Sequence, residues 1–452
     1  MSAGRPLGGL WVALLMLGCT NVDVVAVGGD GALPAADAGA VSVDAGDVCD
    51  GLGPPVVVGD GPRGRSLCGG SVAERTFRYA LCSCTSIAFS TPVRTDSFDS
   101  RMGPYSAPGG RGGAVGSNGD VQLSSPMVFG GSLWAAGAAG VQAPGAGTPV
   151  TVGGELRSGG PFTSMSSLGV DLDAYVAGDV SASELRVDGA LVTPASATVS
   201  ATTEAVGARR TEPVAVPPPC DCDPAVLLDV GALVRAAADD HDDAAAGLAP
   251  DALRGYAEDT RVSLPCGRYF FDGVSGTGSL TFEVTGRAAV YVRGDLAPGG
   301  ALRVEVAPGA ELDLFVEGVL SAEGGVAFGD PARPAAARLY LGGSGRVNLT
   351  ATSVFAGNVY APRAEFATSG ELEVFGAIFV GGIAASGGVE IHYDTAVLDV
   401  GADCPPPEGG CDTCRDCRNQ ACVAGECDAC TSSDQCCSPL LCIAGRCQAE
   451  PF

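Results

Sequence analysis

The sequence predicts a mainly β protein: a right-handed parallel β-solenoid with a short inserted helical pair and a C-terminal disulfide-rich module. Three observations lead to this fold class. Residues 264–394 consist of short apolar runs separated by glycine, without a long helical segment. A three-residue phrase that starts with glycine recurs at similar spacing along the chain. Ten cysteines crowd into residues 411–447.

The apolar runs have the length and the pattern of strands. Leu302-Arg-Val-Glu-Val306 alternates apolar and polar residues, as a half-buried strand does. Leu312-Asp-Leu-Phe-Val316 and Val389-Glu-Ile-His-Tyr393 are similar short runs rich in β-branched and aromatic residues. With 68 glycines and 30 prolines in 452 residues, the composition also favours turns over helices.

The recurring phrase is glycine, one variable residue and an aliphatic residue. It starts at Gly131, Gly154, Gly178, Gly189, Gly294, Gly318, Gly357 and Gly376. Several intervals between these glycines are 23 or 24 residues, and the last is 19. Roughly 20 residues is one coil of a parallel β-solenoid, whose coils stack to share an apolar column. A glycine-rich antiparallel sandwich is the alternative that this pattern leaves open.

The charge balance bears on the class of partner. The chain has 52 acidic and 26 basic side chains, all of the latter arginine, for a net charge of −26. Such a surface repels phosphate backbones, which argues against nucleic-acid binding. Only two histidines are present, His241 and His392, which leaves little for histidine-based catalysis or metal binding. We therefore expect no cofactor and no bound metal.

Residues 1–18 are predicted to be a signal peptide, with Arg5 before an apolar segment too short to span a bilayer. Met16-Leu-Gly-Cys19 resembles a bacterial lipobox, although the family prefers leucine where Met16 stands. The resemblance implies cleavage before Cys19, a lipid on its sulfur and attachment to a membrane. Thr20 after the cysteine implies the outer membrane. Ordinary signal cleavage with a stray thiol is the alternative.

Residues 19–47 are predicted to be a flexible acidic tether, because repeated Asp-Gly-Ala and Asp-Ala-Gly steps cannot bury enough apolar surface to order. The tether resembles those of surface lipoproteins from myxobacteria. We expect an N-terminal solenoid part at 48–195, a linker or excursion at 196–222, and a second solenoid part at 260–400. The disulfide-rich module is expected to occupy 401–452.

Residues 223–259 form the one segment with strong helical spacing. Asp223 and Pro224 suit a helix start, and Gly247 and Pro250 should break the segment into two helices. The acidic run 239–243 could bind calcium, but five consecutive residues do not converge on one point along a helix. We expect a solvated acidic face there instead.

The second solenoid stretch resembles a domain of unknown function found in pilus-assembly-like and bactofilin-like bacterial proteins. The likeness is carried by short segments, namely Leu264-Pro-Cys-Gly-Arg-Tyr269, Tyr291-Val-Arg-Gly-Asp295, Phe355-Ala-Gly-Asn-Val-Tyr-Ala-Pro362, Phe375-Gly-Ala-Ile-Phe-Val380 and His392-Tyr-Asp394. It covers roughly 75–397 if the helical pair is an insertion. That family has no assigned catalytic residues, so the resemblance implies none here.

Apart from Cys19, the cysteines are even in number and lie in a chain predicted to be exported, which indicates a disulfide framework. The disulfide candidates are Cys49, Cys68, Cys82, Cys84, Cys220, Cys222, Cys266, Cys404, Cys411, Cys414, Cys417, Cys422, Cys427, Cys430, Cys436, Cys437, Cys442 and Cys447. Zinc on Cys427 and Cys430 with another pair is a weaker alternative. An iron–sulfur cluster is weaker still, because the spacing after Cys417 does not match.

Spacing suggests some of the pairings. The Cys82-Ser-Cys84 and Cys220-Asp-Cys222 doublets each place two thiols on one side of a strand, so a double rung between them is geometrically reasonable. Cys266 and Cys404 flank the second solenoid part and are hypothesised to pair. In the C-terminal module, Cys417, Cys422 and Cys427 repeat as Cys437, Cys442 and Cys447, shifted by twenty residues. This duplication resembles dickkopf-like cysteine modules.

Taken together, the sequence predicts a lipid-anchored, non-enzymatic structural or adhesion protein of the outer membrane or cell surface. A protein or polysaccharide partner would be met there. One alternative is a polysaccharide-active β-helix enzyme that uses carboxylates such as Asp295, Glu305, Asp313 and Glu317. The other is a self-assembling, bactofilin-like scaffold, because solenoid ends expose strand edges unless they are capped. The C-terminal module is expected to cap one end.

Overall fold

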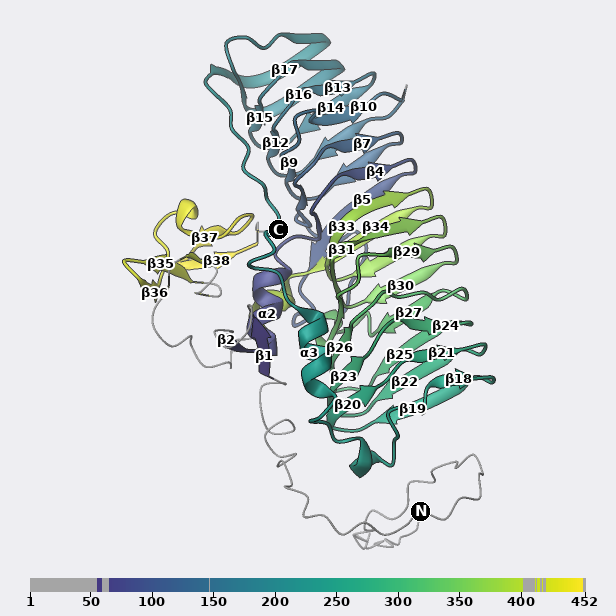
Figure 1. Cartoon of the computed structure of the whole chain (residues 1–452). Coiled ribbons are helices and arrows are strands. Elements are labelled where there is room, and N and C mark those ends of the chain that lie inside the picture. The colour runs from purple at the N-terminus through teal and green to yellow at the C-terminus, as the bar shows by residue number, and fades with distance from the viewer. Residues whose placement is uncertain are drawn as a thin grey trace, which may run out of the picture. The chain divides into compact units, whose positions relative to one another are not determined.

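A computed structural model of the chain describes residues 55–58, 65–145, 147–400, 411, 413–414, 417 and 420–449. Residues 81–211 and 254–394 form a parallel β-solenoid, which confirms the predicted fold class (Figure 1). The described residues hold two α-helices, α2 (Gly69–Thr76) and α3 (Val230–Ala237). Ahead of α2, β1 (Pro55–Val58) pairs antiparallel with β2 (Arg65–Cys68).

Each full coil supplies strands to three parallel sheets, here called faces A, B and C. Face A stacks β20 (Gly267–Phe271), β23 (Arg287–Val292), β26 (Glu311–Val316), β28 (Ala337–Leu341), β31 (Asn358–Thr368), β33 (Ile378–Ala385), β3 (Leu81–Ser83), β6 (Val115–Ser117), β9 (Leu133–Ala135), β12 (Leu156–Ser158), β15 (Ala174–Val176) and β16 (Val180–Thr193). The longest strands bend and serve more than one face.

Faces B and C are built in the same way. Face B contains β18 (Arg254–Tyr256), β21 (Val274–Gly276), β24 (Leu296–Pro298), β29 (Arg346–Leu349), β31, β33, β4 (Ile87–Phe89), β7 (Val121–Leu123), β10 (Val141–Ala143), β13 (Phe162–Ser164), β16 and β17 (Val199–Thr211). Face C stacks β19 (Thr260–Leu264), β22 (Leu280–Val284), β25 (Leu302–Val306), β27 (Val326–Gly329), β30 (Ser353–Ala356), β32 (Leu372–Phe375), β34 (Val389–Asp394), β5 (Val93–Phe98), β8 (Met127–Phe129), β11 (Val150–Val152), β14 (Ser167–Val170), β16 and β17.

The order of coils in space differs from their order in the chain. The chain enters the stack in the middle, at β3, and builds coils up to β17 at one end. It then returns past the middle and builds from β18 at the other end back to β34 (Figure 1). β33 pairs with β3 and β4, and β34 pairs with β5. This seam makes one continuous stack of the two predicted solenoid parts.

The glycine phrase marks strand starts whose aliphatic residue points into the core. Leu133 pairs with Leu156 in the next coil, Leu296 with Leu320, and Val359 with Ile378. All are fully buried. The interval from Gly154 to Gly178 is different: Leu156 pairs with Ala174 on face A, whereas Val180 pairs with Phe162 on face B. That interval is therefore not a coil repeat.

Face A is covered on its outer side as well. α3 lies against β23 and β26. Beneath and beside it runs a file of aromatic side chains, one per coil, in which neighbouring ring centroids are 4.8–5.9 Å apart. The file is Tyr291, Phe315, Tyr340, Tyr360 and Phe379. Because both sides of these strands are buried, β23 after Arg287 and β26 from Leu314 to Val316 are continuously apolar rather than alternating.

The return segment, residues 212–229, is called the strap here. Cys220 and Cys222 of the strap form disulfides with Cys82 and Cys84, which is the double rung expected from the two doublets. Farther along, the backbone N–H of Leu228 donates a hydrogen bond of 2.9 Å to the hydroxyl of Tyr360. The strap is thus fixed to face A at both places.

The predicted linker and helical pair differ from the structure. Residues 199–211 of the linker form β17, the last coil, because their backbone completes the ladder on β16. The helix starts at Val230, with Asp229 as its N-cap accepting from Ala232, and not at Pro224. The second helix is replaced by the 3-10 turn η2 (Asp243–Ala246), which ends at Gly247 in the left-handed region, followed by β18.

The remaining regular elements are short. The 3-10 turn η3 (Pro334–Ala336) lies between β27 and β28, whereas η4 (Thr395–Asp399) follows β34 and contacts α2. The described residues of the C-terminal module form two antiparallel hairpins and a 3-10 turn, namely β35 (Ala421–Val423), β36 (Glu426–Asp428), η6 (Ser433–Gln435), β37 (Leu441–Ile443) and β38 (Arg446–Gln448).

The double rung predicts an unequal response to cysteine removal. Each rung closes a loop with a sequence separation of 138, so either one alone retains the loop-closure effect. Replacing Cys84 and Cys222 by Ser should therefore cost little. Replacing all four cysteines should lower the free energy of unfolding by about 5 kcal/mol, the chain-entropy value for a loop of this size. Urea unfolding of the two variants measures this, and equal costs would contradict it.

Candidate functional site

The outer side of face B carries a shallow trough across the seam. Its floor is a file of outward residues in register, three alanines between two amides: Asn348, Ala367, Ala384, Ala88 and Gln122. Outward positions in five successive coils are about 4.8 Å apart, so the file is roughly 19 Å long. The trough has a volume of about 410 Å³. Alanines form the floor because their side chains are the shortest that a strand offers.

A row of hydroxyl residues borders this floor. It occupies the outward position two residues further along each coil and consists of Thr350, Ser369, Ser386, Ser90 and Ser124, all exposed. The hydroxyls of Ser90 and Ser386 donate to the backbone carbonyls of Ala385 and Thr368, which leaves their lone pairs free to accept. No charged side chain lines the trough among the described residues. The trough therefore offers an uncharged row of hydrogen-bonding groups.

A polar cluster lies at the seam on face C. Asp96 of β5 is the register partner of His392 of β34, and its Oδ1 is 2.7 Å from the histidine Nδ1. Both residues are 3% exposed. The hydroxyl of Tyr105 donates to Asp96 Oδ2 at 2.8 Å, and the tyrosine ring stacks on the imidazole with centroids 3.9 Å apart. Burial, and then the hydrogen bond to Asp96, raise the pKa of Tyr105 to about 12.

A second buried carboxyl group reinforces the seam nearby. Asp394, at the end of β34, accepts hydrogen bonds from the backbone N–H and the hydroxyl of Ser100 at 2.9 and 2.7 Å. Burial raises the pKa of Asp394, and these hydrogen bonds oppose the shift. The hydroxyl of the neighbouring Tyr393 donates to the carbonyl of Phe77 at 2.8 Å. Polar contacts thus join residues that are about 300 positions apart.

The sequence alone did not single out the trough, Asp96 or Tyr105, and it assigned His392 no role. The trough residues are mainly alanines, serines and amides, which form no recognisable binding or catalytic motif in the sequence. Asp96 and His392 are 296 residues apart, and no local pattern relates them. The strand pattern of Val389–Tyr393 does predict that His392 lies on a strand, next to an inward-facing residue. It does not predict which residue His392 contacts.

Five disulfides cross-link the described part of the C-terminal module. Each hairpin carries two of them, Cys411–Cys422 and Cys417–Cys427 on the first, and Cys430–Cys442 and Cys436–Cys447 on the second. A fifth, Cys414–Cys437, connects the two units. The structure thus corrects one feature of the predicted duplication. The counterpart of Cys417 is Cys436 rather than Cys437, because the adjacent Cys437 forms the connecting bond.

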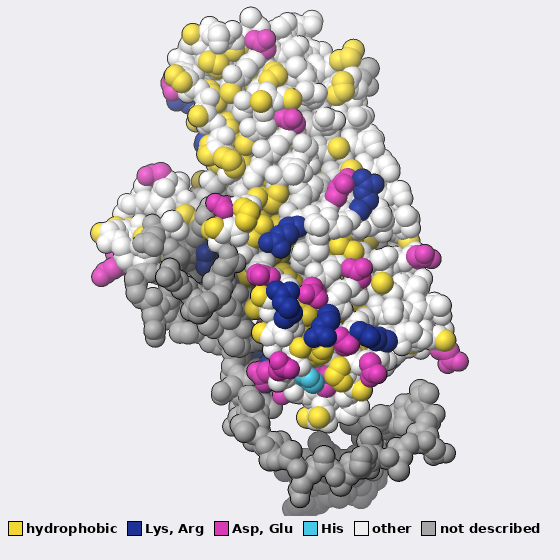
Figure 2. All heavy atoms as spheres, viewed as in Figure 1, with side chains coloured by type: hydrophobic (Ala, Val, Ile, Leu, Met, Phe, Trp, Pro, Cys, Tyr) yellow, Lys and Arg dark blue, Asp and Glu magenta, His cyan; other side chains and the backbone are white. Residues whose placement is uncertain are grey.

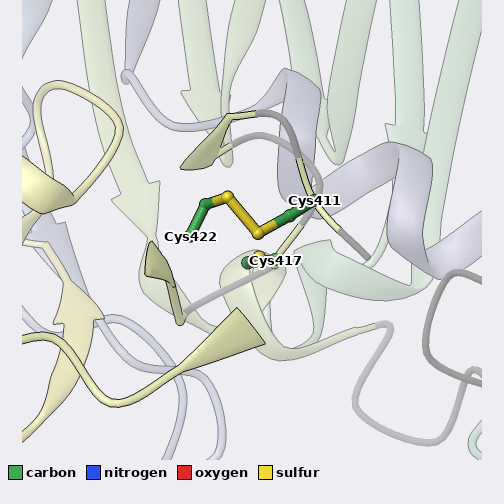
Figure 3. A group of neighbouring side chains, drawn as sticks. All are labelled: Cys411, Cys417 and Cys422. Atoms are coloured by element: carbon green, nitrogen blue, oxygen red, sulfur yellow. A yellow bond between two sulfur atoms is a disulfide. The ribbon is translucent and has the colours of Figure 1, made fainter. Parts of the chain in front are cut away.

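The two hairpin turns of the module are also alike. Each turn has Ala-Gly with positive φ at both residues, as two-residue hairpins require: Ala424 and Gly425 in the first, Ala444 and Gly445 in the second. Figure 3 shows Cys411 bonded to Cys422 with Cys417 beside them. The sulfurs that come close enough to suggest a metal site are all engaged in disulfides, so they offer no thiolate.

The four carboxylates considered for catalysis each have a structural partner. Asp295 accepts from the backbone of Val319, and Glu305 pairs with Arg261 at 2.8 Å. The other two lie on and beside the covered side of face A. Asp313 is 3% exposed and pairs with Arg338 at 2.6 Å, and Glu317 pairs with Arg235 of α3 at 3.0 Å.

The sequence predicted that the acidic run 239–243 is a solvated face, and this holds only in part: Asp239 and Asp240 are exposed, whereas Asp243 is buried. Asp240 pairs with Arg268 of β20 at 2.6 Å. The carboxylates of Asp242 and Asp243 accept from the backbone N–H groups of Arg268 and Phe270. These N–H groups belong to β20, the first strand of face A, and no other described strand pairs with its outer edge. The run therefore caps the solenoid end, and burial raises the pKa of Asp243.

Several predicted residues lie outside the described part of the chain. The signal peptide, the lipidation residue Cys19, the tether and Cys49 are among them, as is Cys404. Cys266 is disulfide-bonded, but its hypothesised bond to Cys404 stays a prediction for that reason. Among the described residues, no helix is long and apolar enough to cross a membrane. The disulfide content indicates an exported, extracytoplasmic protein.

The seam cluster yields a prediction for Tyr105. Replacement by Phe keeps the ring that stacks on His392 but removes the hydrogen bond to a charged acceptor, which contributes about 1.5–3 kcal/mol. We expect faster amide hydrogen exchange in β5 and β34, measured by mass spectrometry. Tyr175→Phe is the matched control, since its hydroxyl bonds Asp173 on an upper coil. Unchanged exchange at the seam in Tyr105→Phe would contradict the prediction.

A domain-family model and a solved structure are similar to parts of this chain. A domain of unknown function, DUF7305, matches residues 221–400, which run from the strap through the second solenoid part. No curated protein matches the chain. The crystal structure of an ice-binding protein from an Antarctic bacterium of the Flavobacteriaceae is similar at a TM-score of 0.17 and 11% identity, covering 71% of this chain and 97% of that chain. A likeness this weak carries no argument about function.

Proposed function

We propose that this protein is a non-enzymatic structural and binding protein, attached to the outer membrane through a lipid on Cys19. In this proposal it binds a neutral, hydroxyl-rich polysaccharide at the cell surface through the trough on face B. The observation that carries the proposal is the trough itself. It is an uncharged row of amides and hydroxyls on a chain with a net charge of −26.

The spacing of the trough suits a polymer rather than a small molecule. The same outward positions recur in five coils at about 4.8 Å, so a chain lying along the stack meets similar groups at each step. The row of serine and threonine oxygens can accept hydrogen bonds from ligand hydroxyls, and Asn348 and Gln122 can both donate and accept. A polyanion would gain no cation here and would meet the repulsion of the acidic surface.

The charges elsewhere on the surface support a structural role. Figure 2 shows arginine side chains beside acidic ones rather than gathered into a separate basic patch. Arg261 with Glu305, and Arg287 with Glu311, are two such pairs. Paired arginines leave little positive surface for a phosphate backbone. The rigid stack would then hold the trough away from the membrane at the end of the predicted tether.

The trough is tested by filling it. Ala384→Arg places a long charged side chain on the floor without altering a core position, and we expect binding of neutral glucans such as dextran to be lost. The control is Thr163→Arg, an exposed outward residue of β13 on the same face beyond the trough. Affinity electrophoresis in gels containing dextran or a polyuronate compares the proteins. Equal retardation of Ala384→Arg and wild type would refute the site.

The anchor is tested separately. Cys19→Ser removes the only sulfur that the lipobox resemblance assigns to the lipid, so we expect loss of labelled palmitate and release from the membrane fraction. Trough binding should survive in this variant, which separates the two halves of the proposal. Retention of the label in Cys19→Ser would show that the lipid, if any, is attached elsewhere.

A further inference from the structure

Two glutamates lie side by side on the outer surface of face C. Glu373 of β32 and Glu390 of β34 are Cα partners, so their strands hold them at the roughly 4.8 Å separation of neighbouring strands. Like charges at this spacing repel each other. Their side chains are 44% and 60% exposed, which keeps the repulsion modest but does not remove it. A positively charged group between the two carboxylates would therefore be favourable.

His392 points a ring nitrogen into the space between these carboxylates. It lies two residues beyond Glu390 on the same side of β34, and its Nε2 is 3.7 Å from a carboxylate oxygen of each glutamate. Among the described residues, Nε2 makes no hydrogen bond within 3.5 Å, although the side chain is only 4% exposed. This nitrogen therefore lies beside two carboxylates, and no described residue forms a hydrogen bond with it.

The orientation of the imidazole is fixed by its surroundings. Asp96 is a carboxylate and can only accept, so Nδ1 donates its proton to Oδ1 at 2.7 Å. In the neutral ring the lone pair is then on Nε2 and faces the two glutamates. Tyr105 stacks on the ring at a centroid distance of 3.9 Å, and Phe375 contacts it at 5.0 Å. The ring therefore cannot turn its Nε2 away.

The basic residue next to the cluster does not neutralise it. Arg94 of β5 is the register partner of Glu390. Its Nε instead lies 3.6 Å from Asp96 Oδ2, and among the described residues it forms no ion pair with either glutamate. When the imidazole is neutral, its Nε2 and two carboxylate oxygens converge with no hydrogen-bond donor between them. A cation satisfies all three electron-pair donors at once.

We propose that His392, Glu373 and Glu390 form a binding site for Zn²⁺ or a similar first-row divalent cation. One imidazole and two carboxylates are ligands that zinc accepts, at about 2.0–2.2 Å. Two ligands of a tetrahedral ion at this distance are roughly 3.3 Å apart, so the observed 3.7 Å needs only a small side-chain adjustment. The three ligand atoms lie within 4.8 Å of one another. The exposed side of the glutamates leaves the fourth position to water.

Asp96 is the positioning residue of this site. A carboxylate that accepts from the far nitrogen of a metal-binding histidine fixes the tautomer and raises the basicity of the ligand. Asp96 belongs to β5, whereas His392 and Glu390 belong to β34, so the site spans the seam. An ion held there would stabilise the pairing of the two solenoid parts, because a ligand that binds only the folded state favours it. This role is independent of the trough on face B.

Zinc titration of the purified exported protein by calorimetry, after treatment with chelator, tests the proposal. We expect one Zn²⁺ per chain and a higher unfolding temperature in its presence. The double variant Glu373→Gln and Glu390→Gln leaves the core untouched and should weaken binding more than 10-fold, since even second-shell changes cost about 10- to 100-fold. Asp96→Asn should keep the stoichiometry and weaken binding within that range.

The matched control is an acidic pair without a histidine. Glu283 and Glu305 are Cα partners on β22 and β25 of the same face. Changing both to Gln should leave zinc binding intact. X-ray absorption at the zinc edge should show nitrogen and oxygen ligands including an imidazole. Sulfur ligation, no binding in excess zinc, or equal affinity in the Glu373→Gln/Glu390→Gln variant would each overturn the proposal.

Discussion

The structure depends on the pairing of β33 and β34 with β3, β4 and β5 at the seam. Here strands almost 300 residues apart form the same parallel ladder as strands of consecutive coils. Without it, each solenoid part would expose the backbone edges of all three faces and the apolar end of its core. Loop closure over this distance costs only slightly more than over a short loop, because the entropy grows with the logarithm of length. The ladder and the core contacts of a full coil outweigh that cost.

A second constraint is the covering of face A. The strap and α3 bury the outer sides of strands that in a bare solenoid would face water, so large aromatic side chains occupy those positions. The same burial encloses the pair Asp313–Arg338. Burial would raise the pKa of the neighbouring Glu311, but the positive charges of Arg338 and Arg287 outweigh it and lower the pKa. Removing Arg338 alone would leave buried carboxylates uncompensated, which is far costlier than removing an exposed ion pair.

The sequence predicted the fold class because its signals are local. The glycine phrase indicates where a strand starts. Its aliphatic residue, such as Leu133 or Val359, then indicates which side of that strand faces the core. The seam could not be predicted, since periodicity shows that coils have neighbours but not which coil adjoins which. The Cys82–Cys220 and Cys84–Cys222 rungs were suggested because both doublets have the spacing of a strand. Asp96 and His392 are too far apart in the sequence for any spacing to relate them. The alanines of the trough floor belong to no motif that indicates binding or catalysis.

The ends of the stack differ in a way that bears on assembly. At the β20 end, Asp242 and Asp243 occupy the backbone donors that another strand would use, so residues of the inserted segment cap that end rather than the predicted C-terminal module. At the other end, β17 pairs only with β16 among the described strands and presents charged residues, with Glu204 bonded to Arg209. Charge on an edge strand discourages further pairing. The β20 edge is thus capped at one end and the other end is charged, which disfavours end-to-end filaments. The trough and the cluster around His392 both lie at the seam, in the middle of the stack. Each coil there has a neighbour on both sides and is least able to fray.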